Sequence, residues 1–378
     1  MRIAQVAPLI ESVPPKHYGG TERIVAYLTE ELVRLGHKVT LFASGDSITS
    51  AELVPVCRRS FRENKRATDY LSHEVLLMDH VMQRSGEFDV IHFHTGCLHY
   101  LISRHLTVPH VTTLHGRLDT PELLRLYERF REMPIISISN AQRAPWPCAN
   151  WQATIYHGLP QDLFQFHPEP GGYLAFLGRV SPEKRVDRAI EIAKRVGMPL
   201  KIAAKVDPAD RRYFKRKIEP LLNDPHIEWL EEISDKDKDE FLGNAYALLF
   251  PIDWPEPFGL VMIEAMACGT PIIAYDRGSV PEVMENGVTG FIVSEIKQAV
   301  EAVGRVRDLS RARCREVFEK RFTASRMASD YVNAFMRVAD SRMRRVEPSL
   351  ESSVRSFQGA WPADDELRGP ADREFQKF

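Results

Sequence analysis

The segment 248–275, LLFPIDWPEPFGLVMIEAMACGTPIIAY, predicts how its part of the chain folds. It opens with an apolar run typical of a buried strand, and two closely spaced prolines then interrupt regular structure. Residues 259–268 are mostly good helix formers, and the Gly-Thr-Pro that follows is a helix stop signal. A second apolar run, PIIAY, closes the segment. Strand, helix and strand in this order indicate the βαβ unit of a parallel sheet.

Two glutamates lie inside this unit, although burying a carboxylate is costly unless it has partners. Glu256 falls in the loop at the carboxyl end of the first strand, and Glu264 falls inside the helix. Ligands of doubly wound sheets bind at that edge, where a helix N-terminus favours anions. Both carboxylates are suited to accept hydrogen bonds from hydroxyl groups on either side of a bound phosphate. The pattern therefore indicates a sugar attached to a nucleotide.

The same alternation of strands and helices runs through the first half of the chain. We expect helices at 19–37 and about 66–85. Alternation of this kind predicts a parallel sheet covered on both faces. The expected strands are 2–8, 38–44, 88–94, 110–116, 134–139 and 151–160.

The pattern restarts after a Pro/Gly-rich linker at 160–172. The chain is thus predicted to be α/β, with two Rossmann-like doubly wound domains that face each other across a cleft. We expect a first domain at 1–160, a second at 161–321, a helix at about 322–345 and a poorly ordered polar tail at 346–378. Within the second domain, strands are expected at 173–179, 199–205 and around HIEWLEE, and helices at 187–197, 208–222 and 235–246.

Composition favours a globular protein without a strong attraction to polyanions. The 378 residues carry a formal net charge of −2, with 44% hydrophobic and 27% charged residues. No apolar run approaches the roughly 18 residues of a membrane span, and MRIAQVAPLI does not read as a signal peptide. Five scattered cysteines without CxxC spacing favour a reducing compartment. We therefore expect a cytoplasmic location.

Two cations follow the first strand of the second domain in FLGRVSPEKRV. Arg179 closes that strand and Lys184 precedes a helix, so both are expected at the cleft edge of the sheet. Arginine binds phosphate through two parallel hydrogen bonds and lysine as a point charge, which suits a diphosphate. The alternative is that both are solvated loop charges.

Polar and glycine residues of the first domain fall at the same kind of edge. Gly19 and Gly20 would let the backbone approach a ligand, although a Gly-Gly pair is also typical of a tight turn and GxGxxG is absent. His115 follows an apolar strand. His92 and His94 alternate along another strand and could suggest a metal, but without a third ligand we interpret them as polar residues at a strand end.

A basic stretch, CRRSFRENKR, spaces three arginines four residues apart. This spacing would place them on one helical face with Lys65 nearby. Such a face is usually solvated, and it could also contact anionic lipid. A peripheral membrane contact would involve Arg58, Arg62, Lys65 and Arg66.

The motifs GGTERI, LHG, FLGRVSPEK, EPFGLVMIEAMACGTPII and GSVPEVMENGVTGFIV occur in this order between residues 19 and 293, and the resemblance that they carry spans the chain to about residue 340. As a set they resemble the family 4 retaining glycosyltransferases of the GT-B fold, and the E-x7-E element with its Pro-Phe-Gly is the most specific part. The resemblance implies that the helix at 322–345 crosses back onto the first domain. GCLHY, after HFHT, supplies no evident acidic or basic residue for the acceptor, so the acceptor stays open.

The resemblance also implies roles for individual residues. Arg179 and Lys184 match the pair that neutralises the donor diphosphate, and Glu264 matches the glutamate that holds the ribose. Glu256 matches the residue that contacts the donor sugar near its anomeric carbon, beside backbone N–H groups of Phe258, Gly259 and Leu260. In the first domain, His115 matches a histidine against the donor sugar, and Gly19 and Gly20 match a loop near the diphosphate.

The implied reaction moves a hexose from a UDP- or GDP-sugar to an acceptor hydroxyl with retention, without a metal or other cofactor. Paired carboxylates on the two sides of a bond are typical of hydrolases, whereas these two are expected on one side of the donor. Three alternatives share parts of the pattern: a non-hydrolysing sugar-nucleotide epimerase, a non-catalytic sugar-nucleotide binding protein and a nicotinamide dehydrogenase. The last lacks GxGxxG.

Overall fold

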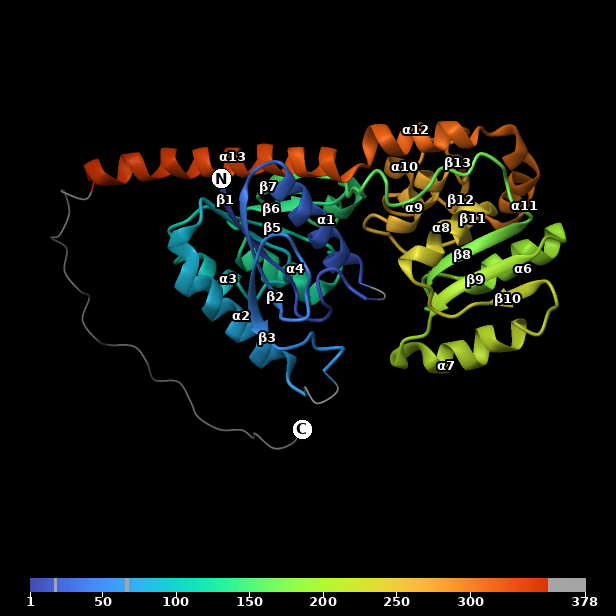
Figure 1. Cartoon of the computed structure of the whole chain (residues 1–378), viewed down its shortest axis with the longest axis horizontal. Helices are drawn as coiled ribbons and strands as arrows, with labels where there is room; N and C mark the ends of the chain where they lie inside the picture. Colours follow the sequence, from blue (N-terminus) through green and yellow to red (C-terminus); the bar gives the residue numbers. More distant parts are fainter. Residues whose placement is uncertain (17–18, 65–67, 353–378) are drawn as a thin grey trace, which may run out of the picture. The chain divides into compact units, whose positions relative to one another are not determined.

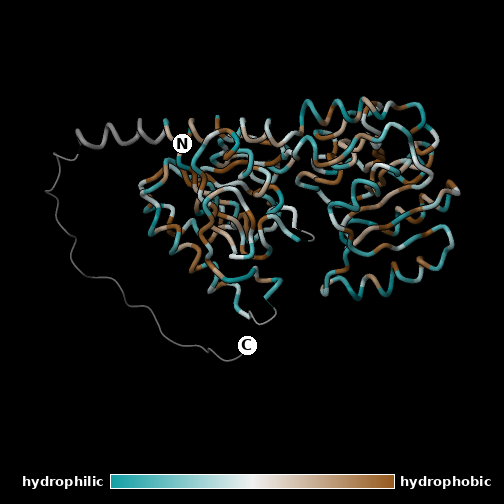
Figure 2. The backbone as a smooth tube through the Cα atoms, in the orientation of Figure 1, coloured by the Kyte–Doolittle hydropathy of each residue, from teal (hydrophilic) through white to brown (hydrophobic). Residues whose placement is uncertain are grey.

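The structure is a computed structural model that describes residues 1–16, 19–64 and 68–352 (Figure 1). Residues 1–339 form one unit, which contains both sheets, and the chain from Asp340 onward forms a second. In the first unit, hydrophobic residues concentrate in the strands of each sheet (Figure 2). This distribution is expected for parallel sheets, whose strands are buried on both faces.

The first sheet has seven parallel strands in the order β3-β2-β1-β4-β5-β6-β7. This is the doubly wound order, in which the direction of winding reverses between β1 and β4. The strands are β1 (Arg2–Val6), β2 (Lys38–Ser44), β3 (Glu52–Cys57), β4 (Val90–Phe93), β5 (His110–Thr113), β6 (Ile135–Ser137) and β7 (Trp151–Thr154). The helices between them are α1 (Gly20–Arg34), α2 (Tyr70–Arg84), α3 (Tyr100–Ser103), α4 (Pro121–Arg129) and α5 (Asn140–Arg143).

The second sheet has six parallel strands in the order β10-β9-β8-β11-β12-β13, and its winding reverses between β8 and β11. Its strands are β8 (Tyr173–Arg179), β9 (Leu200–Lys205), β10 (Ile227–Trp229), β11 (Ala245–Phe250), β12 (Ile272–Tyr275) and β13 (Gly290–Val293). Its helices are α6 (Val186–Val196), α7 (Arg211–Tyr213), α8 (Asp235–Gly243), α9 (Leu260–Cys268), α10 (Val280–Val283), α11 (Ile296–Arg305) and α12 (Arg311–Arg321). The expected pair of Rossmann-like sheets is confirmed.

Helix α13 (Ala324–Ser352) follows the second sheet, but its first turns pack in the core of the first. Met327, Tyr331 and Phe335 are fully buried there, among residues of β1 and α1. The helix extends beyond the predicted end at 345, and the rest of the predicted tail, 353–378, lies outside the described residues.

The chain passes between the sheets twice, after β7 and again before α13, and the two passages are hydrogen-bonded to each other. The Leu159 amide donates to the Phe322 carbonyl at 2.9 Å, and the Ala324 amide donates to the Leu159 carbonyl at 2.7 Å. Arg326 Nη2 adds hydrogen bonds to the carbonyls of Tyr156 and His157, at 2.7 and 3.0 Å. The two passages therefore form one connected hinge segment.

Two local predictions were wrong. Arg58 and Arg62 lie in turns after the edge strand β3, not on a helix, and Arg66 lies outside the described residues. The sequence reading missed β3 because Pro55 argues against a strand, although an edge strand tolerates proline. Residues 208–221 form short 3-10, α and π turns instead of one helix. Pro220 lacks the N–H that a continuous helix needs.

Candidate active site

A cavity of about 370 Å³ is lined by residues from both sheets. Its volume falls within the range of about 300–1,000 Å³ that small-molecule sites occupy. It lies where loops leave the carboxyl ends of β8, β9, β11 and β5, as expected for doubly wound sheets. The lining contains every predicted site residue except Arg179, namely Gly19, Gly20, His115, Lys184, Glu256, Phe258, Gly259, Leu260 and Glu264.

The N-terminus of α9 opens into this cavity. Pro255 and Pro257 keep the chain out of regular structure after β11, and Gly259 then takes the left-handed conformation, with φ of +82°, that precedes the helix. Gly259, Leu260 and Val261 all line the cavity. Because the first N–H groups of a helix have no partner within the helix, this end presents donors and a partial positive charge to a ligand.

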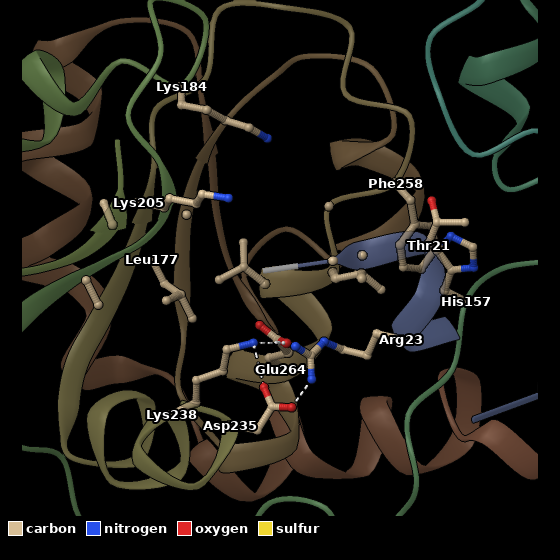
Figure 3. Close-up of a pocket in the computed structure, with 18 of the residues that line it drawn as sticks. Thr21, Arg23, His157, Leu177, Lys184, Lys205, Asp235, Lys238, Phe258 and Glu264 are labelled. Atoms are coloured by element: carbon tan, nitrogen blue, oxygen red, sulfur yellow. Dashed lines mark hydrogen bonds and ion pairs between the residues drawn. The ribbon is translucent and has the colours of Figure 1, made fainter. Parts of the chain in front are cut away.

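Lys184 and Glu256 form an ion pair at one side of the cavity. Their side chains are 15% and 10% exposed, so both charges are largely removed from water. Trp254 Nε1 donates a second hydrogen bond to Glu256 Oε2 at 3.0 Å, and Lys184 Nζ lies 5.0 Å from the centroid of the Trp254 ring. Lys205 also lines the cavity, and both lysines extend toward the same region (Figure 3). The arrangement places cationic groups beside the α9 N-terminus.

The loop after β12 fixes the backbone of Glu256. Gly278 has φ of +56°, and a Cβ atom there would lie 2.4 Å from the backbone nitrogen and oxygen of Glu256. The Ser279 amide donates to the Glu256 carbonyl at 2.9 Å, and Ser279 Oγ donates to the Phe258 carbonyl at 2.8 Å. Close approach of two backbones therefore determines where the Glu256 carboxylate sits.

Glu264 belongs to an ionic network that reaches across the cavity (Figure 3). Lys238 Nζ lies 3.0 Å from Glu264 Oε1 and 3.1 Å from Asp235 Oδ1. Asp235 also pairs with Arg23, which comes from α1 beside the first sheet. Sequence reasoning missed Lys238, Asp235 and Arg23. The capping box of α8, in which Ser234 bonds Asp237, was the available signal that this helix begins here.

His115 lines the cavity and belongs to a row of polar side chains. Its Nε2 is 2.9 Å from His94 Nδ1, and His94 Nε2 is 2.7 Å from Gln5 Oε1. The His115 ring stacks on that of His157, with centroids 5.4 Å apart. Burial lowers the pKa of His115 to about 3, and it also lowers the pKa values of His94 and His157 well below their usual range. These rings are therefore neutral near pH 7.

Arg179 is the predicted residue that the cavity does not include. Its guanidinium donates to Glu183 Oε1 at 2.7 Å and lies 3.6 Å from Asp207 Oδ2. The neighbouring Gly178 does line the cavity, so Arg179 is at the predicted strand end but its side chain binds carboxylates. Its role as a diphosphate ligand stays a prediction.

The remaining candidates lie elsewhere. His92 is buried, with Nε2 2.7 Å from Thr113 Oγ1, and among the described residues no group of three His, Cys, Asp or Glu side chains could hold a metal ion. Arg58 is exposed, whereas Arg62 pairs with the buried Glu11. Lys65 and Arg66 lie outside the described residues. In the described part of the chain, no helix is both long and apolar enough to span a bilayer.

Comparison with known proteins matches both halves of the chain to glycosyltransferases. The model of glycosyl transferases group 1 matches residues 162–321, and that of glycosyltransferase family 4 matches residues 18–151. The D-inositol 3-phosphate glycosyltransferase of Mycolicibacterium smegmatis is 24% identical, over 90% of this chain and 91% of its own. An uncharacterized glycosyltransferase of Methanocaldococcus jannaschii is 26% identical, over 61% and 68% of the two chains.

Solved structures show the same fold. Anabaena HepE, crystallised with UDP and glucose, superposes with a TM-score of 0.70 at 19% identity, over 89% of this chain and 99% of that chain. Fold and site together define a glycosyltransferase of the GT-B type that uses a nucleotide-sugar donor. The chain belongs to the family 4 glycosyltransferases, as the motifs indicated.

Proposed function

We propose that the chain transfers a hexose from a UDP- or GDP-sugar to an acceptor hydroxyl, with retention at the anomeric carbon. The proposal rests chiefly on the cavity in which Lys184 and Glu256 meet the N-terminus of α9. Anabaena HepE was crystallised with UDP and with UDP-glucose, which makes UDP the first nucleotide to test. The acceptor would be a hydroxyl of a growing polysaccharide, a glycolipid or a small glycoside.

The leaving group of this reaction is a nucleoside diphosphate, whose negative charge grows as the glycosidic bond breaks. Lys184, Lys205 and the first residues of α9 all line the cavity, and Lys205 is paired with Asp207 at 3.1 Å. Fixed positive groups in a site with little water stabilise developing charge without reorganising. In this proposal they are the main source of rate enhancement, and Arg179 would join them only after leaving Glu183.

The two glutamates act as binding groups in this proposal. Glu264, held by Lys238, would accept hydrogen bonds from the ribose hydroxyls, and Glu256, held by Lys184 and Trp254, would accept them from the donor sugar. Both come from the second sheet, on loop and helix of one βαβ unit. Inverting and retaining hydrolases instead place carboxylates on opposite sides of the scissile bond. Same-face attack by the acceptor accounts for retention without a carboxylate nucleophile.

We also propose that the reaction needs no metal, because Lys184 and Lys205, which line the cavity, would neutralise the diphosphate in place of a divalent cation. A contact with anionic lipid on the inner face of the cytoplasmic membrane is proposed through Arg58, Arg62, Lys65 and Arg66. The exposed Leu71 and Val75, 57% and 53% accessible on one face of α2, would add apolar contact. Sedimentation with vesicles of anionic and of neutral lipid would separate charge-dependent binding from none.

Calorimetric titration with UDP and GDP, with and without EDTA, tests the donor site. Release of nucleoside diphosphate in the presence of candidate acceptors then tests transfer, and proton NMR of the glycoside reads its anomeric configuration. Saturable binding, acceptor-dependent release and a retained configuration are expected. Conversion of the sugar nucleotide without an acceptor would instead support an epimerase, and binding without turnover a binding protein.

A further inference from the structure

A row of three hydrogen-bonded side chains runs from the interior of the first sheet to the cavity. Gln5 is on β1, His94 follows β4 and His115 follows β5, so neighbouring parallel strands bring them together at one edge. Gln5 is fully buried and His94 is 3% exposed, whereas His115 is half-buried and lines the cavity. Neither Gln5 nor His94 lines the cavity.

Each imidazole in this row holds a single ring proton. Burial disfavours the charged form of His94 and His115 and lowers the pKa of both, and no carboxylate contacts either ring among the described residues. A neutral imidazole has one N–H donor and one bare nitrogen acceptor. Fixing one nitrogen of such a ring therefore fixes the other.

The orientation of Gln5 decides the sequence of donors and acceptors. Its amide oxygen faces His94 Nε2 at 2.7 Å, and its amide nitrogen is buried without a hydrogen-bond partner among the described residues. In this orientation the amide oxygen only accepts, so His94 Nε2 carries the proton. His94 Nδ1 is then bare and accepts from His115 Nε2 at 2.9 Å. His115 Nδ1 is left without a proton, and no described residue forms a hydrogen bond with it. Rotating the Gln5 amide by half a turn would reverse every step.

We propose that Gln5 and His94 are positioning residues that hold His115 in its Nε2–H form, so that its Nδ1 accepts a hydrogen bond from a sugar hydroxyl of the ligand. The inference rests on the proposed function for the identity of the ligand. It adds to that function a means of recognising a sugar hydroxyl by the hydrogen bond that the hydroxyl donates. Stacking of the His157 ring on His115 keeps the imidazole plane in place.

His115 in this form serves as an acceptor of a hydrogen bond and not as a proton acceptor. With a pKa of about 3, its conjugate acid does not persist near pH 7. A methoxy group or a fluorine in place of the recognised hydroxyl cannot donate, so such a donor analogue should lose this contact. A neutral hydrogen bond contributes about 0.5–1.5 kcal/mol net, which corresponds to about a 2- to 12-fold change in affinity.

Two-bond ¹⁵N–¹H correlation NMR of the ¹⁵N-labelled full chain tests the proposal without substrate. His115→Asn assigns the signal. The expected spectrum has one protonated and one bare nitrogen in His115, with Nε2 protonated. Finding Nδ1 protonated in the unmodified protein overturns the proposal, and so does a rapidly exchanging mixture of both forms.

Gln5→Met removes the acceptor at nearly constant side-chain volume, and it should release His115 into a mixture of tautomers. Thr113→Val is the matched control, because it removes the buried hydrogen bonds that Thr113 Oγ1 forms with His92 and with the Tyr331 hydroxyl and leaves the Gln5–His94–His115 row intact. The control should keep the His115 spectrum. An unchanged His115 tautomer in a folded Gln5→Met variant overturns the proposal. If that variant does not fold, the spectrum of the unmodified protein still tests whether His115 carries its proton on Nε2.

Binding measurements separate this inference from the proposed function. Gln5→Met should bind UDP as the unmodified chain does and bind UDP-glucose about 2- to 12-fold more weakly. Equal loss for UDP and UDP-glucose would overturn the role of His115 toward the sugar. If the unmodified chain binds neither UDP nor GDP while the Nε2–H spectrum is observed, the proposed donor fails and the assigned tautomer stands.

Discussion

Replacing Lys184 by alanine removes the cation that lies closest to Glu256 in the cavity. The side chain is 15% exposed, so the charge acts through a medium between water and protein interior. Two unit charges 4 Å apart interact by about 4 kcal/mol at an effective dielectric constant of about 20. Part of the attraction between Lys184 and the diphosphate exists before the glycosidic bond breaks, so only the remainder accelerates the reaction. Loss of one preorganised donor to a developing charge lowers kcat by about 10²–10³-fold.

We therefore expect Lys184→Ala to lower kcat for acceptor-dependent release of nucleoside diphosphate by about 10²–10³-fold. The donor KM should change less, because the α9 N-terminus and Lys205 still hold the diphosphate. Circular dichroism and thermal unfolding establish that the variant is folded. The variant leaves Glu256 with Trp254 Nε1 as a remaining donor.

Two variants control for unrelated effects. Lys184→Arg keeps the charge and should recover part of the rate. Lys194→Ala removes a lysine of α6 that is 42% exposed and pairs with Asp224 at 3.1 Å, and it should leave kcat unchanged. A folded Lys184→Ala enzyme with a rate within threefold of the unmodified chain would falsify the electrostatic account.

Glu264→Ala should raise the donor KM by about 10- to 100-fold, since a hydrogen bond to a charged group contributes about 1.5–3 kcal/mol. A change confined to the acceptor KM would contradict the assignment of Glu264 to the ribose. Gly278→Ala should lower kcat in a folded protein, because the added Cβ would press on the Glu256 backbone, whereas Gly86→Ala, at an exposed glycine, should leave kcat unchanged. Equal activities of the two variants would refute the link between Gly278 and the position of Glu256. Acid should destabilise the fold below about pH 6.5, because the unfolded chain binds protons that the native chain excludes. Each buried histidine with a lowered pKa then removes about 1.4 kcal/mol of unfolding free energy per pH unit, measured by urea unfolding, and a flat profile from pH 7 to 5 would contradict this. The histidines concerned are His92, His94, His99, His115 and His157.

The sequence was informative where structure depends on neighbours along the chain. The strand β11, the prolines, Gly259 and the helix α9 are local features, so the surroundings of Glu256 and Glu264 could be predicted from one short segment. The parallel sheets could also be predicted, because the alternation of strands and helices alone indicates them. The position of Lys184 in the cavity followed from its place after a strand end.

Contacts between distant segments could not be predicted in this way. Gln5 and His94 are 89 positions apart, and their hydrogen bond follows only once β1 and β4 are known to be neighbours. Arg23 and Asp235 are separated by 212 positions and lie beside different sheets. Arg179 shows the converse: its strand end was predicted, but its side chain pairs with Glu183 and Asp207 and does not line the cavity.

The hinge segment makes the architecture discontinuous in sequence, with consequences for protein engineering. The first sheet depends on Met327, Tyr331 and Phe335, which are translated after the whole second sheet. A hybrid enzyme with one splice near residue 160 would therefore pair the first sheet with an α13 helix from another protein. Recombination between relatives should exchange the second sheet as a cassette with two junctions, one beside Leu159 and one beside Thr323, where an isolated β-bridge already joins the two passages.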